Sequence, residues 1–272
     1  MKKDICQTSH GAVSTTDSQG DGRPVVLIHG NSLSSESYEH QLSSELGRRW
    51  RLIAFDLPGH GESPPAADPS RTYRLDGYAE VLREITEHLG LARPILVGHS
   101  LGGHIAMEAV GAGLDVGGLF VFGAPPLRNP PDFAAAFLAP IAEGPSFRAR
   151  LREEEIDRLA GAFMPPGVRP PPCYARSIAA TDPAAREWLG RDVRHGHHHD
   201  ERDVVAALNS HAAMAHGEHD QLVSRSYIEG LGLTACWRGC MQIIPGAGHC
   251  PEHDSPEEFN QTLYSFLTEL AP

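Results

Sequence analysis

The stretch that decides the fold is residues 95–110, ILVGHSLGGHIAMEAV. It opens with a short apolar run typical of a buried strand, and its last eight residues read as a helix. A strand that turns directly into a helix strains the backbone of the residue at the turn, so the neighbouring residues must be small. Gly98 and Gly102 meet this need because they carry no Cβ atom. We therefore expect Ser100 to stand exposed at the end of a sheet, with the N-terminus of a helix behind it.

The rest of the chain alternates between the same two kinds of segment. Short apolar runs predict strands at residues 25–28, 51–55, 116–122, 212–215 and 241–244. Helical patterns cover residues 36–48, 72–89 and 256–270. Strands that alternate with helices predict a mostly parallel, doubly wound sheet with right-handed crossovers.

Residues 125–202 have a different character. Three proline clusters separate short helical pieces at 147–162 and 184–189, and no strand pattern is visible. We predict a helical cap, inserted after the strand at 116–122, that covers the carboxyl edge of the sheet, where ligands bind. Residues 1–124 and 203–272 then form the core of a single domain, and residues 125–202 form its lid.

Composition narrows the class of protein. The 272 residues suffice for one large domain, and a formal net charge of −12 argues against nucleic acid and anionic membranes as partners. No segment approaches the roughly 20 apolar residues of a membrane span, and no export signal follows the first lysines. The five cysteines are scattered and odd in number, which is unlike a disulfide framework. We expect a cytoplasmic protein.

The exposed serine suggests nucleophilic chemistry, for which a base and an orienting acid are needed. Of the 16 histidines, His249 is the best candidate base, because it ends the small-residue loop 245–249 between the last predicted strand and the last helix. Such a loop can carry an imidazole back over Ser100.

The candidate acid is Asp220, which follows the strand predicted at 212–215. Glu218 lies two residues away and stays open as an alternative. His99 and His219 are expected to have supporting or structural roles.

Acyl transfer also needs two donors aimed at the oxyanion. One candidate is the backbone N–H of Leu101, directly after Ser100, and the other is the backbone N–H of Asn31 in the loop after residues 25–28. The Asn31 side chain could also orient the substrate carbonyl, or its amide could bond locally as a loop residue.

Four stretches together resemble the α/β-hydrolase superfamily: residues 26–32, 55–63, 98–102 and 246–249. They span most of the predicted sheet. The resemblance implies the α/β-hydrolase fold, a mostly parallel twisted sheet flanked by helices and carrying an inserted helical cap.

More narrowly, residues 29–32 (HGNS), 56–60 (DLPGH) and 102–105 (GGHI) resemble the α/β-hydrolase type of N-acyl-homoserine lactonase. The likeness extends from about residue 8 to the final helix and is thinnest in the cap. Those enzymes open a lactone with a Ser, acid and His triad, which maps here to Ser100, Asp220 and His249. This chain has His99 where that type has tryptophan, and aspartate where the relative has glutamate.

Residues 195–200 (HGHHHD) are similar to the His-x-His-x-Asp-His motif of zinc-dependent lactonases. The match fails because His199 occupies the aspartate position and Asp200 the final histidine position. We expect a solvated polar loop, with no metal and no cofactor.

These observations predict a metal-independent serine hydrolase of small esters or lactones, with N-acyl-homoserine lactones among the candidate substrates. A carbon–carbon bond hydrolase or an amidase would use the same triad. A ligand receptor built on the same fold is the alternative outside enzymes. The sequence carries no signal for an oligomeric state.

Overall fold

The computed structural model describes residues 1–138, 144–195 and 198–270. Its eight strands form one sheet in the order β1-β2-β4-β3-β5-β6-β7-β8. β2 pairs antiparallel with β1 and β4, and all other neighbours are parallel. The strands are β1 (Lys2–Thr8), β2 (Gly11–Asp17), β3 (Pro24–Ile28), β4 (Arg51–Phe55), β5 (Ile95–His99), β6 (Gly118–Phe122), β7 (Ala212–Gly217) and β8 (Gln242–Ile244). The predicted mostly parallel sheet is confirmed.

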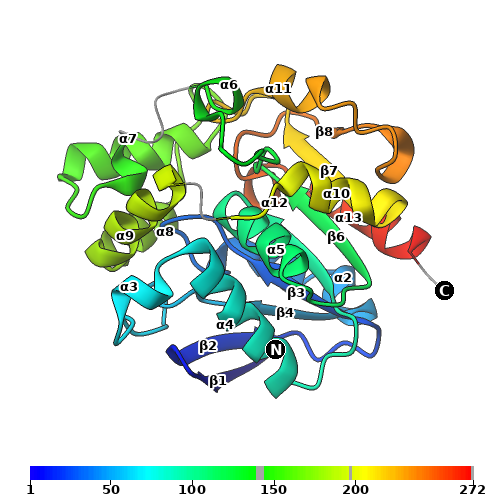
Figure 1. Cartoon of the computed structure of the whole chain (residues 1–272), viewed down its shortest axis with the longest axis horizontal. Helices are drawn as coiled ribbons and strands as arrows, with labels where there is room; N and C mark the ends of the chain where they lie inside the picture. Colours follow the sequence, from blue (N-terminus) through cyan, green and yellow to red (C-terminus); the bar gives the residue numbers. More distant parts are fainter. Residues whose placement is uncertain (139–143, 196–197, 271–272) are drawn as a thin grey trace.

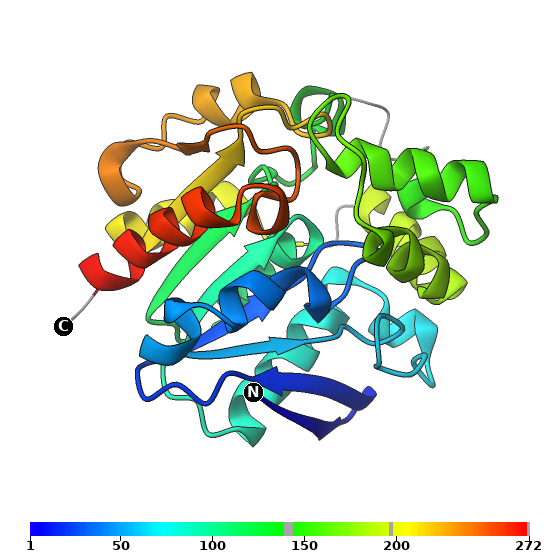
Figure 2. The same ribbon diagram turned by 180° about the vertical axis from the view of Figure 1, so that it is seen from behind.

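Helices cover both faces of the sheet. One face packs against α4 (Leu75–His88), α5 (Leu101–Gly111) and α10 (Glu201–Leu208), as Figure 1 shows. The other face, seen in Figure 2, packs against α1 (Glu39–Leu42), α2 (Glu45–Arg49) and α13 (Pro256–Glu269). The buried strands are apolar on both sides because alternate residues face opposite layers: in β3, Val26 joins the first layer and Val25 the second.

Between β6 and β7 the described chain is helical. It forms α6 (Phe133–Ala136), η3 (Pro145–Phe147), α7 (Glu153–Phe163), α8 (Pro172–Ala180), α9 (Pro183–His195) and then α10. Figure 1 shows α6 to α9 beyond the ends of the central strands, whereas α10 lies beside α5. A small apolar cluster joins Phe163 and Ile178 of this segment to Leu33 and Cys250 of the core. The insertion therefore packs partly on the loops of the sheet. No helix in the described ranges combines the length and apolar character needed to cross a bilayer.

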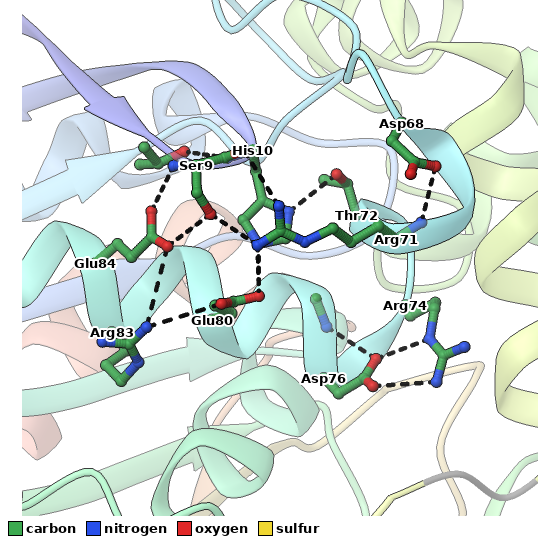
Figure 3. Close-up of polar contacts among 12 residues, drawn as sticks. Ser9, His10, Asp68, Arg71, Thr72, Arg74, Asp76, Glu80, Arg83 and Glu84 are labelled. Carbon is green, nitrogen blue, oxygen red and sulfur yellow. Dashed lines mark hydrogen bonds and ion pairs between the residues drawn. The ribbon is translucent and has the colours of Figure 1, made fainter.

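The N-terminal hairpin β1–β2 has no counterpart in the sequence prediction. β1 is an edge strand whose side chains are mostly exposed, so it lacks the apolar run that marks the central strands. Its turn is fixed on α4 by polar contacts, shown in Figure 3: the Ser9 N–H donates to Glu84 Oε2 (2.6 Å), and His10 Nε2 lies 2.9 Å from Glu80 Oε2.

Several predicted helices were wrong in their extent. The helix expected at 36–48 is three short pieces, η1 (Ser35–Tyr38), α1 and α2. α1 ends at Leu42 with Ser43 as its C-cap, and Ser44 caps the start of α2 by accepting from the Leu46 N–H (3.1 Å). α7 begins at Glu153, where three acidic residues fill the first turn, and α8 and α10 were not predicted.

Candidate active site

Ser100 occupies the sharp turn between β5 and α5. Its backbone has φ 49° and ψ −115°, a conformation that is strained for a residue with a side chain. A Cβ atom at Gly98 would lie 2.5 Å from the carbonyl oxygen of Gly102, and one at Gly102 would lie 2.1 Å from that of Ile28. Strand and helix meet this closely only because both positions are glycine, as the sequence predicts.

His249 and Asp220 form a buried pair. His249 Nδ1 lies 2.8 Å from Asp220 Oδ2, and because a carboxylate only accepts, Nδ1 carries the hydrogen. The other oxygen of Asp220 accepts from the N–H groups of Leu222 (2.7 Å) and Val223 (3.1 Å). Burial alone would raise the pKa of Asp220, but the charge and hydrogen bond of His249 outweigh it and hold that pKa below its ordinary value. Asp220 is thus held as the carboxylate partner of the imidazole.

Glu218 does not contact His249. Its carboxylate accepts from the Gly246 N–H (2.9 Å), and 47% of its side chain is exposed. Of the two candidate acids, the structure brings only Asp220 to the imidazole. The side chain of His219 is half exposed, and its backbone N–H donates to Ala247 (2.7 Å).

Two further histidines lie behind this pair. His99 is fully buried, donates from Nε2 to the carbonyl of His249 (2.9 Å) and stacks on Phe122. His216, which the sequence analysis did not select, places Nδ1 3.9 Å from Asp220 Oδ2. Burial lowers the pKa of both imidazoles, so they are neutral at pH 7. His216 lies inside a buried strand, a position that gives no catalytic signal in the sequence.

The two candidate oxyanion donors line the cavity that contains Ser100. Within the described part of the chain, the backbone N–H groups of Asn31 and Leu101 have no hydrogen-bond acceptor. The Asn31 side chain is already engaged, because Nδ2 donates to the carbonyl of Ser146 (2.8 Å) and Oδ1 accepts from Ser32 (3.1 Å). Its amide therefore links the loop after β3 to the helical insertion.

The cavity at Ser100 is largely apolar. It is partly open to solvent, and His249 forms part of its wall. The insertion contributes four aromatic side chains: Phe133, Phe137, Phe147 and Phe163. His104 and His198, neither of which was given a role from the sequence, also line it. Such a cavity suits a small substrate with an apolar tail and a few polar groups.

Two groups of three potential metal ligands occur among the described residues, namely His10 with Glu80 and Glu84, and His99 with Cys250 and Glu252. In the first group, the carboxylates already face Arg71 and Arg83, as Figure 3 shows.

In the second group, burial raises the pKa of Cys250 and Glu252 well above the ordinary values and so favours the uncharged form of both. A metal ion prefers the ionised thiolate and carboxylate.

The histidine-rich run is only partly described, because residues 196–197 lie outside the described ranges. Of the rest, His199 contacts Glu108 (3.0 Å), and Asp200 caps α10 by accepting from the Arg202 N–H (3.1 Å). His199 and Asp200 are therefore engaged within the chain, whereas His198 is buried and lines the cavity at Ser100, unlike the solvated loop that the sequence predicts.

This architecture is shared with known proteins. Residues 25–262 match the model of the alpha/beta hydrolase family. A non-heme haloperoxidase from Rhodococcus erythropolis is 27% identical over 263 residues, covering 91% of this chain and 93% of that protein. A non-heme chloroperoxidase from Burkholderia pyrrocinia is 26% identical over 264 residues, covering 91% of this chain and 92% of the relative.

Among solved structures, a mutant of the N-acyl homoserine lactonase AidH in complex with N-hexanoyl homoserine lactone superposes with a TM-score of 0.93. It is 30% identical, and the match covers 100% of this chain and 99% of the other. A putative aryl esterase from Burkholderia cenocepacia, at a TM-score of 0.82 and 22% identity, covers 99% of both chains and shares the fold. This chain belongs to the alpha/beta hydrolase family.

Proposed function

We propose that this protein hydrolyses small carboxylic esters or lactones through an acyl-enzyme on Ser100, without a metal ion. The observation that carries the proposal is that Ser100, at its strained turn, lines the same cavity as His249, whose other nitrogen is held by buried Asp220. A nucleophile, a base and an orienting acid are the parts that acyl transfer requires.

Each residue has one role in the proposed reaction. Ser100 Oγ attacks the carbonyl carbon while His249 Nε2 accepts the hydroxyl proton, and Asp220 fixes the tautomer and stabilises the imidazolium. The backbone N–H groups of Leu101 and Asn31 receive the oxyanion. The intermediate collapses, His249 returns the proton to the leaving alkoxide, and water activated by the same imidazole then releases the acid. In a lactone the leaving alcohol stays attached, so the product is a hydroxy acid.

The cavity supports an acylated substrate. Its aromatic lining comes from the insertion. We propose that this insertion, residues 125–202, acts as a lid over the cavity. The likeness to AidH, solved with N-hexanoyl homoserine lactone, favours N-acyl-homoserine lactones within this class. Four phenylalanine rings provide a suitable surface for such an acyl chain.

A labelling experiment tests the proposal. A fluorophosphonate should modify Ser100 covalently, and the unlabelled protein should turn over p-nitrophenyl esters many times. Ser100→Ala should lose both properties while folding normally, and exposed Ser226→Ala should keep both. Labelling without turnover would indicate a ligand receptor, and absence of labelling would overturn the serine mechanism.

A further inference from the structure

Besides His99, which lies behind the catalytic pair, two histidines of the cavity have no part in the proposed reaction. His104 lies on α5, and His198 lies shortly before α10. Both line the cavity that contains Ser100. Ser100 directly precedes α5, and the His104 N–H donates to the Ser100 carbonyl (3.2 Å), so the two residues lie one helical turn apart. His104 can therefore contact a substrate group a few atoms from the scissile carbonyl.

The tautomer of the neutral His104 ring follows from its partner. Nδ1 lies 2.8 Å from Oε1 of Glu201, a fully buried side chain whose Oε2 also accepts from the Leu127 N–H (2.7 Å). Since a carboxylate only accepts, Nδ1 carries the hydrogen, and the neutral ring presents Nε2 as an acceptor. No described residue donates to this Nε2.

His198 has the same arrangement with a different partner. Its Nδ1 lies 2.7 Å from the carbonyl oxygen of His199, which also only accepts, so Nε2 of the neutral ring is again an acceptor. His198 is buried, and its Nε2 has no hydrogen-bond partner among the described residues. A buried acceptor that lacks a donor is unfavourable, so a ligand that supplies one gains affinity.

We propose that His104 and His198 form a subsite for a hydrogen-bond donor of the substrate, in which His104 receives the N–H of an amide next to the scissile ester. This inference rests on the proposed hydrolase function and narrows its substrates to N-acylated amino esters and lactones. A plain alkyl ester leaves the His104 acceptor unpaired. The discrimination comes from unpaired polar groups, which reject an analogue more strongly than a poor apolar fit does.

Two matched substrate pairs test the subsite, each differing only by N–H or CH₂. One pair is N-hexanoyl homoserine lactone and α-(2-oxoheptyl)-γ-butyrolactone. The other is the p-nitrophenyl esters of N-hexanoylglycine and of 4-oxononanoic acid. We define the N–H to CH₂ ratio as kcat/KM for the N–H member of a pair divided by kcat/KM for its CH₂ member. His104→Leu should lower this ratio by about 10-fold, mainly because kcat/KM falls for the N–H member. His88→Leu, an exposed histidine on α4, should leave the ratio unchanged.

Glu201→Gln provides a stricter test because it preserves the size of the side chain. The amide oxygen of the glutamine can still accept from the Leu127 N–H, and its NH₂ group then faces His104 Nδ1. The ring proton then moves to Nε2, which becomes a donor, and the ratio should again fall by about 10-fold. A purely structural role for Glu201 would slow both members of a pair equally.

The outcomes separate the subsite from the proposed function. An N–H to CH₂ ratio that is the same in wild type, His104→Leu and Glu201→Gln overturns the subsite. If the p-nitrophenyl pair is turned over and the lactone pair is not, only the lactones are excluded as substrates. The p-nitrophenyl pair still gives the N–H to CH₂ ratio. If no substrate is turned over, calorimetry with Ser100→Ala protein measures the affinity for the N–H and the CH₂ member of each pair. Equal affinities for the two members overturn the subsite.

Discussion

Asp220 and Glu218 are separated by one residue in the sequence, but their surroundings differ. Asp220 is buried against His249, and Glu218 is half exposed against the Gly246 N–H. Asp220→Asn should lower kcat on a p-nitrophenyl ester by roughly 10⁴-fold, because an amide favours the wrong imidazole tautomer. Glu218→Gln should leave kcat within a few-fold, since it alters only a loop contact. Steady-state kinetics of the two variants test the assignment of Asp220 as the acid. A larger loss of kcat in Glu218→Gln than in Asp220→Asn would contradict it.

The buried carboxyl group of Glu252 should make the stability of the fold depend on pH. Both carboxyl oxygens are buried without hydrogen-bond partners among the described residues, and burial raises the pKa well above its ordinary value of 4.5. Above pH 4.5 the unfolded chain releases this proton and the folded protein keeps it. The group therefore lowers the free energy of unfolding as pH rises toward the folded pKa, by at most about 1.4 kcal/mol per pH unit.

Glu252→Gln should remove this slope. Urea unfolding should find the variant more stable than wild type at pH 7.5, with the advantage shrinking as pH approaches 4.5. A difference that is constant across this range would show that Glu252 is not neutral in the folded protein.

The residues that could be predicted from the sequence are those with a strong local signature. Ser100 lies between glycines after a strand, and His249 ends a small-residue loop before the last helix. The pair of His104 and Glu201 has no such signature, because its members lie 97 positions apart in the sequence. Asn31 was selected for its backbone, but its link to Ser146 depends on how the insertion packs.

At the scale of elements, the turn between β5 and α5 tolerates no added methyl group. A Cβ at Gly102 would lie 2.1 Å from a backbone oxygen of β3. Gly102→Ala should therefore lower the free energy of unfolding by about 3 kcal/mol or more. The control is Gly161→Ala in α7, where a Cβ meets nothing within 4 Å, and where alanine should stabilise by about 0.5–1 kcal/mol. Urea unfolding measures both, and equal effects would contradict the close packing.

The elements predicted correctly are those with apolar runs, such as the central strands β3 to β7. β1 and β2 could not be predicted this way, because an exposed edge hairpin buries few side chains and has no apolar run to detect. Residues 125–202 were predicted to form a helical cap from their prolines, but the limits of the helices there depend on contacts with the core. Burial, which creates the periodic pattern, is weakest in these regions.

At the scale of the whole molecule, the proposed mechanism needs no metal ion. Ser100 and His249 supply the nucleophile and the base, so an ion has no remaining task. Exhaustive treatment with EDTA should leave esterase or lactonase activity unchanged. Activity lost on chelation and restored by zinc would contradict the serine mechanism and return attention to the histidine-rich run.

The hydrogen bond from Asn31 to Ser146 joins the proposed oxyanion donor to the segment that carries the phenylalanine lining. A long acyl chain that orders this segment also steadies the Asn31 loop, so binding energy gained far from the carbonyl is expressed in the rate of the chemical step. In a series of substrates that differ only in acyl-chain length, KM should fall and kcat should rise as the chain becomes longer. Asn31→Ala keeps the backbone N–H but cuts the link, and it should flatten the rise in kcat while preserving the trend in KM.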